Sequence, residues 1–75
     1  MTLKQAIERS RAYNERPTVE FAGSKSDLLA ALYGLYGGEI DDAIENDGTL
    51  DVWGWTGDMA GSEMDWRLRV KLNEY

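Results

Sequence analysis

The chain has 75 residues, a formal net charge of −6, and neither histidine nor cysteine. Its 43% of hydrophobic and 29% of charged residues are typical of one folded domain rather than a disordered chain, so we expect a single domain over residues 1–75. The missing cysteine excludes disulfides and fits a reducing compartment. No apolar stretch is long enough to span a membrane, so we expect a soluble intracellular protein.

The charges are segregated along the sequence. Residues 1–25 hold five bases and three acids, residues 26–66 hold ten acids and no base, and residues 67–75 hold three bases and one acid. An acidic middle of this kind repels nucleic acid and anionic membranes and attracts basic surfaces. We therefore expect no direct binding to nucleic acid or to membranes.

The N-terminal third predicts a helix followed by a short strand. Thr2 and Gln5 form a capping-box pattern at the start of a helix from Leu3 to Glu15. Pro17 ends this helix because the residue before a proline is disfavoured in helical conformation. The alternation in "TVEFA", Thr18 to Ala22, predicts a strand.

A second helix is predicted from Ser26 to Tyr36, with Ser24 or Ser26 as its N-cap. It contains "LLAALYGLY", in which only tyrosine hydroxyls are polar. A helix that is apolar all round must be covered on most sides, by the core or by another subunit. Gly37 and Gly38 end it, because glycine readily adopts the left-handed C-cap conformation.

The segment from Glu39 to Asn46 is interpreted as a third, short helix, with Ile40, Ala43 and Ile44 on its inner face. The dipeptide Asp47-Gly48 then predicts a turn.

Two strands are predicted in the C-terminal third. "TLDVWGWT" places Leu50 and Val52 on one side and Asp51, Trp53 and Trp55 on the other. In "DWRLRVKL", Trp66, Leu68, Val70 and Leu72 point inward, and Arg67, Arg69 and Lys71 point outward. The loop "GDMAGSEM" joins them. The predicted fold class is α+β, with two to three helices on one face of a small antiparallel sheet of two or three strands that ends in a β-hairpin.

The sequence lacks the residues expected of a catalytic or metal site. Without histidine or cysteine, the commonest general base, thiol nucleophile and transition-metal ligands are missing. Aligning Gly48 with the glycine of a calcium loop puts Ala43 in the first ligand position and Gly54 in the twelfth, where a carboxylate is required. We expect no enzyme activity, catalytic residue, cofactor or metal.

The acids that follow Gly38 are candidates for partner binding. On the predicted third helix Glu39, Asp41, Asp42 and Glu45 project outward together. Asp41 and Glu45 would be like charges at i,i+4, which is unfavourable, and acids near a helix C-terminus oppose the macrodipole. Residues that work against the fold tend to mark function, although a solvated face that keeps the protein soluble is the alternative.

The two tryptophans of "VWGW" have two readings. Either Arg67, Arg69 and Lys71 cover Trp53 and Trp55 in a cross-strand ladder, or the rings are exposed anchors for a partner. Gly54 between them is a possible bulge that turns one ring into the core, so we expect one ring buried and the other at least partly exposed.

These features predict a small protein-binding inhibitor. The partner-binding residues expected are Glu39, Asp41, Asp42, Glu45, Asp47, Asp51, Trp53 and Trp55. With "GGEIDDAIENDGTLD" as a phosphate-like face beside "VWGW", the chain resembles in general character the small acidic inhibitors of phages and mobile elements, in particular anti-CRISPR proteins. That resemblance matches no motif. It implies a nucleic-acid mimic, active in the cytoplasm of a bacterial host, that blocks a basic nucleic-acid-binding or recruitment surface of a CRISPR effector complex by steric and charge competition.

Two other functions fit the same sequence. A homo-oligomeric phage accessory or structural protein would use the apolar helix as its contact surface, with a homodimer through Leu29, Tyr33 and Tyr36. An immunity or antitoxin protein would direct the same acids against a basic toxin.

Overall fold

The computed structural model describes residues 1–56 and 63–73. The elements follow the order helix, strand, helix and three strands: α1 (Leu3–Tyr13), β1 (Thr18–Ala22), α2 (Lys25–Tyr36), β2 (Glu39–Ile44), β3 (Leu50–Thr56) and β4 (Glu63–Asn73). Of the loop predicted over 57–64, residues 57–62 lie outside the described residues, and Glu63 and Met64 already belong to β4.

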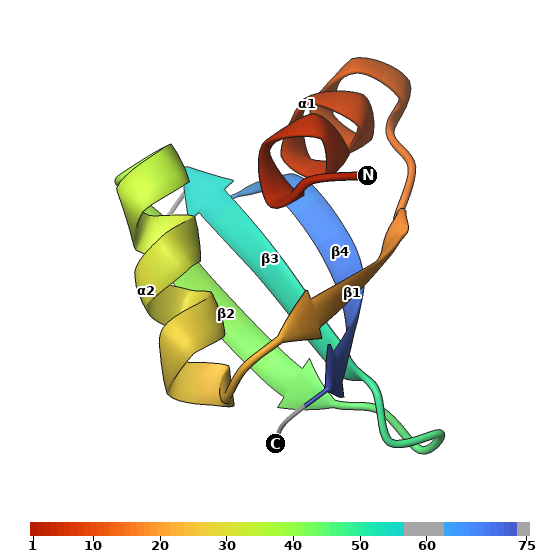
Figure 1. Cartoon of the computed structure of the whole chain (residues 1–75). Helices are drawn as coiled ribbons and strands as arrows, with labels where there is room; N and C mark the ends of the chain where they lie inside the picture. Colours follow the sequence, from red (N-terminus) through yellow and green to blue (C-terminus); the bar gives the residue numbers. More distant parts are fainter. Residues whose placement is uncertain (57–62, 74–75) are drawn as a thin grey trace.

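The four strands form one sheet in the order β1-β4-β3-β2. β1 pairs with β4 in parallel, and the other two pairs are antiparallel. Both helices lie against the same face (Figure 1), so the opposite face, called the open face below, carries no helix. The α+β class and the C-terminal hairpin are confirmed. The sheet has four strands rather than two or three, and it is mixed.

Both helices begin and end at local signals. Thr2 caps α1 and Ser24 caps α2, each in a capping box with the residue three positions on. α1 ends at Tyr13, two residues earlier than predicted, because Asn14 adopts the left-handed conformation with φ 54°. Gly37, with φ 75°, ends α2 as predicted.

The predicted helix from Glu39 to Asn46 is wrong, because this segment forms strand β2. The turn at Asp47-Gly48 is a hairpin turn: Gly48 has φ 86° and its N–H donates to the Glu45 carbonyl over 3.0 Å. The hairpin lets β2 pair with β3 over six consecutive residues. Backbone pairing with β3 thus replaces a helix whose i,i+4 acids repel each other.

The core lies between the helices and the sheet. Its largest fully buried side chains are Trp66, Leu28, Leu32, Leu68, Val52 and Val70. α2 buries only Leu28 and Leu32, whereas Tyr33 and Leu35 are each 48% exposed. Within the described chain α2 is therefore covered on one side, and not on most sides as its composition predicted.

Trp66 on β4 determines which residue β3 can place opposite it. Gly54 is its direct partner, and a Cβ at position 54 would overlap the indole nitrogen of Trp66. Tyr36 contacts the same indole edge-to-face, with 5.4 Å between ring centroids and an interplanar angle of 81°. Gly54 thus leaves the space that the tryptophan ring occupies.

We expect Gly54→Ala to lower the free energy of unfolding by about 1–3 kcal/mol, because the added methyl group forces Trp66 out of its packed position. Gly34→Ala in α2 is the matched control, since its Cβ would meet no atom within 4 Å, and it should raise stability by up to about 1 kcal/mol. Urea unfolding followed by Trp fluorescence measures both. Equal midpoints for the two variants would contradict this account of Gly54.

Candidate functional site

The open face displays the outward-facing side chains of β3 and β4 as the alternation predicted. Asp51 lies directly opposite Arg69, and Trp53 lies opposite Arg67. β2 adds Glu39 beside Trp55 and Asp41 beside Trp53. Acids, bases and two tryptophans therefore share one face of the sheet, on which no helix of the described chain lies.

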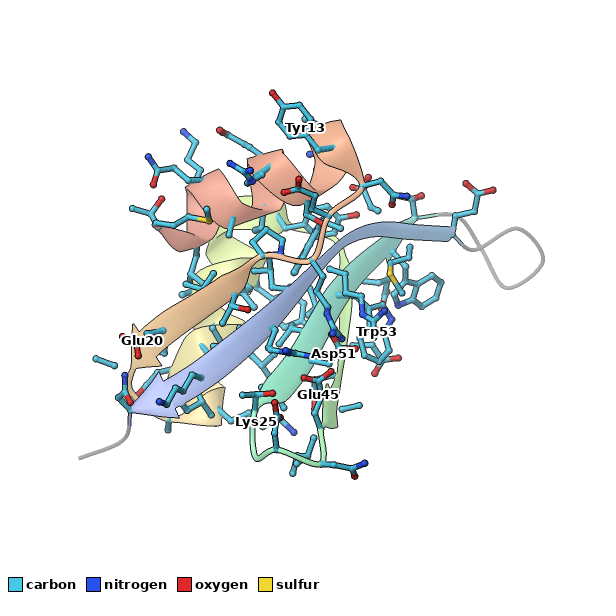
Figure 2. All side chains as sticks on the ribbon, turned by 90° about the vertical axis from the view of Figure 1, so that its right-hand side faces the viewer. Tyr13, Glu20, Lys25, Glu45, Asp51 and Trp53 are labelled. Carbon is cyan, nitrogen blue, oxygen red and sulfur yellow. The ribbon has the colours of Figure 1, made fainter. Side chains whose placement is uncertain are left out.

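Five of these charged residues form a connected group, which we call the arginine–carboxylate cluster: Arg16, Glu45, Asp51, Arg67 and Arg69. Arg67 Nε donates to both Asp51 carboxylate oxygens over 3.0 Å, and its Nη2 lies 2.9 Å from Oδ2. Glu45 accepts from Arg16 over 2.7 Å and from Arg69 over 2.8 Å. Figure 2 shows Glu45 and Asp51 close together on the open side. Bidentate and charge-assisted bonds of this kind hold side chains in one geometry.

The cluster neutralises part of the acidic segment. Arg16 precedes β1, whereas Arg67 and Arg69 lie on β4, so bases from both ends of the sequence converge on acids from its middle. Three guanidinium groups meet two carboxylates. The uninterrupted acidic face expected from the sequence is therefore not formed at Glu45 and Asp51.

Asp47 and Glu45 share one further partner, Thr49. The Thr49 hydroxyl lies 2.7 Å from Glu45 Oε2 and 2.6 Å from Asp47 Oδ1, and its single hydrogen serves only one of them at a time. The Thr49 N–H also donates to Asp47. The Thr49 hydroxyl, followed by Arg69 and Arg16, lowers the pKa of Glu45, and the hydroxyl and N–H of Thr49 lower the pKa of Asp47.

Asp42 lies on the opposite side of the sheet from Asp41. The register pairs it with Val52, whose side chain is buried under the helices. Its carboxylate contacts Lys25 at the start of α2 over 2.7 Å. The ion pair links α2 to β2, and it removes Asp42 from the set of acids that share the open face.

Glu39 and Asp41 remain on the open face beside the tryptophans, and within residues 1–56 and 63–73 neither forms an ion pair. Trp53 and Trp55 are both half-buried. The expectation of one ring at least partly exposed is met by both, whereas the expectation that the other is buried is wrong, since neither ring enters the core.

The register shift near Gly54 explains why neither tryptophan turns inward. The shift falls between Gly54 and Trp55, whose β4 partners are Trp66 and Met64, so the extra residue is Asp65 on β4. The pairing of β3 with β2 is unbroken, which keeps Trp53 and Trp55 on the same face. The cross-strand ladder, one of the two alternatives for these rings, is not seen among the described residues: no base lies over Trp53 or Trp55, and the Arg67 guanidinium group binds Asp51.

The residues predicted to form a homodimer, Leu29, Tyr33 and Tyr36, lie at i, i+4 and i+7 of α2 and therefore on one side of that helix. Leu29 and Tyr36 are half-buried and pack against the core, whereas Tyr33 is exposed. Burial raises the pKa of Tyr36, and the nearby Asp65 carboxylate raises it further.

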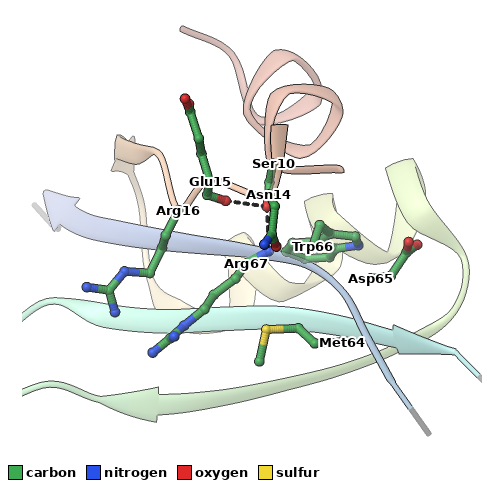
Figure 3. Close-up of a pocket in the computed structure, with 8 residues that line it drawn as sticks. All are labelled: Ser10, Asn14, Glu15, Arg16, Met64, Asp65, Trp66 and Arg67. Atoms are coloured by element: carbon green, nitrogen blue, oxygen red, sulfur yellow. Dashed lines mark hydrogen bonds between the residues drawn. The ribbon is translucent and has the colours of Figure 1, made fainter. Parts of the chain in front are cut away.

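A small pocket of about 190 Å³ opens where α1 meets β4 (Figure 3). Buried Ser10 stands in it, donating to the Glu15 carbonyl over 2.7 Å and accepting from the Arg67 N–H over 2.8 Å. The Arg67 side chain extends from this pocket to Asp51. Ser10 thus holds the end of α1 against the irregular part of β4, and the pocket is smaller than typical ligand sites.

Sequence reasoning did not anticipate the roles of Arg16 and Ser10. Both depend on contacts that join distant parts of the chain. Among the described residues, no group of three or more acids is arranged to hold a metal ion, and no helix is long and apolar enough to cross a membrane. No protein-family model, curated protein or solved structure matches this chain.

We expect Asp51→Asn to lower the free energy of unfolding by about 1–3 kcal/mol, because it leaves Arg67 without its bidentate acceptor. Arg67 is 42% exposed, which places the loss toward the lower end of that range. A double-mutant cycle with Arg67→Met should give a coupling of about 1 kcal/mol. The control cycle is the exposed pair Arg9–Glu15, where no coupling is expected. Equal coupling in both cycles would contradict a structural role for the cluster.

The lowered pKa of Glu45 predicts a dependence of stability on pH. Its pKa in the folded protein lies below the ordinary carboxyl value of about 4.3, so its contribution is complete above that value and is lost as the pH falls through the folded pKa. When the pH is lowered from about 7 to about 3, the free energy of unfolding of Glu45→Gln should therefore fall by less than that of the parent chain. Urea midpoints measure this, with Glu15→Gln as the matched control, and parallel curves for Glu45→Gln and the parent would refute it.

Proposed function

We propose that the chain is a small protein-binding inhibitor, and that it contacts a basic partner surface through one half of the open face. The contact surface, called the β2–β3 patch, consists of Glu39, Asp41, Trp53 and Trp55. The observation that carries this proposal is the pair of half-buried tryptophans that lie on a face without helices in the described chain, flanked by two acids.

The acids of the open face fall into two groups, those that bind arginines and those that do not. Within the described chain, Glu45 and Asp51 bind arginines, whereas Glu39 and Asp41 have no ion-pair partner. Tryptophan is enriched in the residues that dominate binding energy at interfaces, because a large rigid ring buries much area. Unpaired acids beside such rings favour a cationic partner and increase the rate of encounter.

The target of such an inhibitor is a protein with a basic surface. A CRISPR effector complex remains the target that the resemblance implies, and a basic toxin is the alternative. Mimicry of a phosphate backbone has weaker support than the sequence suggested, because Asp42, Glu45 and Asp51 are each bound to a base of the same chain. Steric blockade by a compact aromatic and acidic patch needs fewer free carboxylates than mimicry of a phosphate backbone does.

The test is affinity capture from a bacterial lysate at low salt, with elution at high salt and identification by mass spectrometry. We expect Trp53→Ser with Trp55→Ser to abolish recovery of basic proteins, because the rings supply the buried contact area. The control Tyr13→Ser, at a residue 69% exposed on α1, should recover the same proteins as the parent.

Charge variants in the same experiment test whether Glu39 and Asp41 contact the partner. Glu39→Gln with Asp41→Asn should weaken capture and reduce its dependence on salt, because these carboxylates face the partner. Glu45→Gln should weaken it little, because the charge of Glu45 is already compensated by Arg16 and Arg69. If recovery falls equally for both changes, or for neither, the β2–β3 patch is not the contact surface.

A further inference from the structure

The outer edge of β2 offers backbone hydrogen-bonding groups to a strand from another chain. β2 is the last strand of the described sheet (Figure 1), and only its inner edge pairs, with β3. The Glu45 N–H donates to the Thr49 carbonyl over 2.8 Å, which fixes the phase of the antiparallel ladder. Hydrogen-bonded pairs recur at every second residue, so the N–H and C=O groups of Ile40, Asp42 and Ile44 point away from β3.

The hydrogen bond of Asp42 supports this assignment independently. Its N–H donates to the side chain of its neighbour, Asp41 Oδ1, over 3.2 Å. An amide in the middle of a strand that is satisfied by an adjacent side chain has no strand partner on that side. An incoming strand would offer this amide a carbonyl acceptor and release the Asp41 carboxylate for a cation.

Among residues 1–56 and 63–73, charge is the only protection that β2 shows against such pairing. Proteins usually block sheet edges with proline, a bulge, lysine or a covering segment. β2 contains neither proline nor lysine, and its six residues keep an unbroken register with β3. At its end Ile44 is 79% exposed. The charged residues of β2 are all acids, and with Asp42 paired to Lys25, Glu39 and Asp41 remain to repel acidic strands and attract basic ones.

We propose that an extended basic segment of the partner adds to the outer edge of β2 as a further strand of the sheet. This inference rests on the proposed function and specifies how the partner binds. The residues of the segment that face the open side would be Lys or Arg, because they meet Glu39 and Asp41. Those that face the helix side would be apolar, because they lie beside Ile40 and Ile44.

The chain contains a strand of this composition. In β4, "RLRVKL", bases on the open face alternate with Leu68, Val70 and Leu72 toward the helices, and this strand pairs with β3. β4 therefore provides an internal example of a basic strand that binds the one acid of its neighbour β3, Asp51, through Arg67. A second copy of β2 is a poor occupant, since "EIDDAI" would place acids near acids.

The first experiment uses a capped hexapeptide that alternates lysine with valine as the probe. Binding to the full-length, isotope-labelled chain is followed by amide NMR at low salt. We expect the amides of Ile40, Asp42 and Ile44 to shift and their exchange with solvent to slow, and salt to reverse both effects. A peptide that alternates glutamate with valine should cause neither. Shifts confined to the Trp53 and Trp55 indoles, or no shifts, would overturn the proposal.

Two further comparisons test the backbone contact itself. Asp42→Pro removes the outward N–H, whereas Asp42→Ala keeps it, and both lose the ion pair with Lys25. Peptide affinity should be about tenfold lower for Asp42→Pro than for Asp42→Ala, and equal affinities would refute the model.

A second pair of probes leaves the protein unchanged: the peptide is N-methylated on alternate residues, either the odd-numbered or the even-numbered ones. Binding should be abolished only when the methylated amides are those that face β2. An equal loss of affinity for both peptides would refute the edge model.

The outcomes separate this inference from the proposed function. Capture of basic proteins that needs Trp53 and Trp55 but tolerates Asp42→Pro would leave the proposed function intact and overturn edge binding. Peptide binding at the edge without any captured basic protein would support edge binding and overturn the proposed function. Sedimentation tests whether a second copy of the chain occupies the edge. If the chain forms a dimer that Asp42→Pro dissociates, the occupant is another β2, and the proposal of a basic partner segment is overturned.

Discussion

The pairing of β4 with β3 is the constraint on which the surface of this protein depends. It brings Arg67 and Arg69 next to the acids of the central segment, and the parallel pairing of β1 with β4 accompanies the approach of Arg16 to the same group. The buried Asp51 carboxylate is acceptable there only because Arg67 binds both of its oxygens. Sheet topology therefore decides which acids stay available to a partner.

Once the cluster is formed, the open face has two unlike halves. Toward the turn that joins β2 and β3, the acids Glu45 and Asp51 are compensated by bases from β4 and from before β1, and hydrogen bonds hold the side chains. Toward the start of β2, Glu39 and Asp41 accompany two half-buried indole rings. The proposed partner contact uses the second part, because there it needs to break no described ion pair.

Alternation and capping were sufficient to predict much of the fold, but pairing between distant segments was not predictable from one sequence. Trp66 and Arg67 fell on opposite faces as expected, and the capping boxes marked both helix starts.

The segment "EIDDAIEN" fits the periods of both a helix and a strand, since Ile40 and Ile44 share a face in either structure. Asp47-Gly48 was the signal for a hairpin. Nothing local indicated that Arg16 would reach Glu45, 29 residues away, so the candidate site was only partly predicted.

The sequence Trp53-Gly54-Trp55 reverses the usual distribution of side chains across a half-buried strand. The smallest residue faces the helices and the two largest face the side without helices, because Trp66 of β4 already fills the space above Gly54. The core explains the glycine but does not require tryptophan at either neighbouring position. Trp66 itself leaves its Nε1 without an acceptor among the described residues, at a cost of about 1–3 kcal/mol. Packing within the chain thus accounts for the core side of β3, and the proposed partner contact would account for its two outward rings.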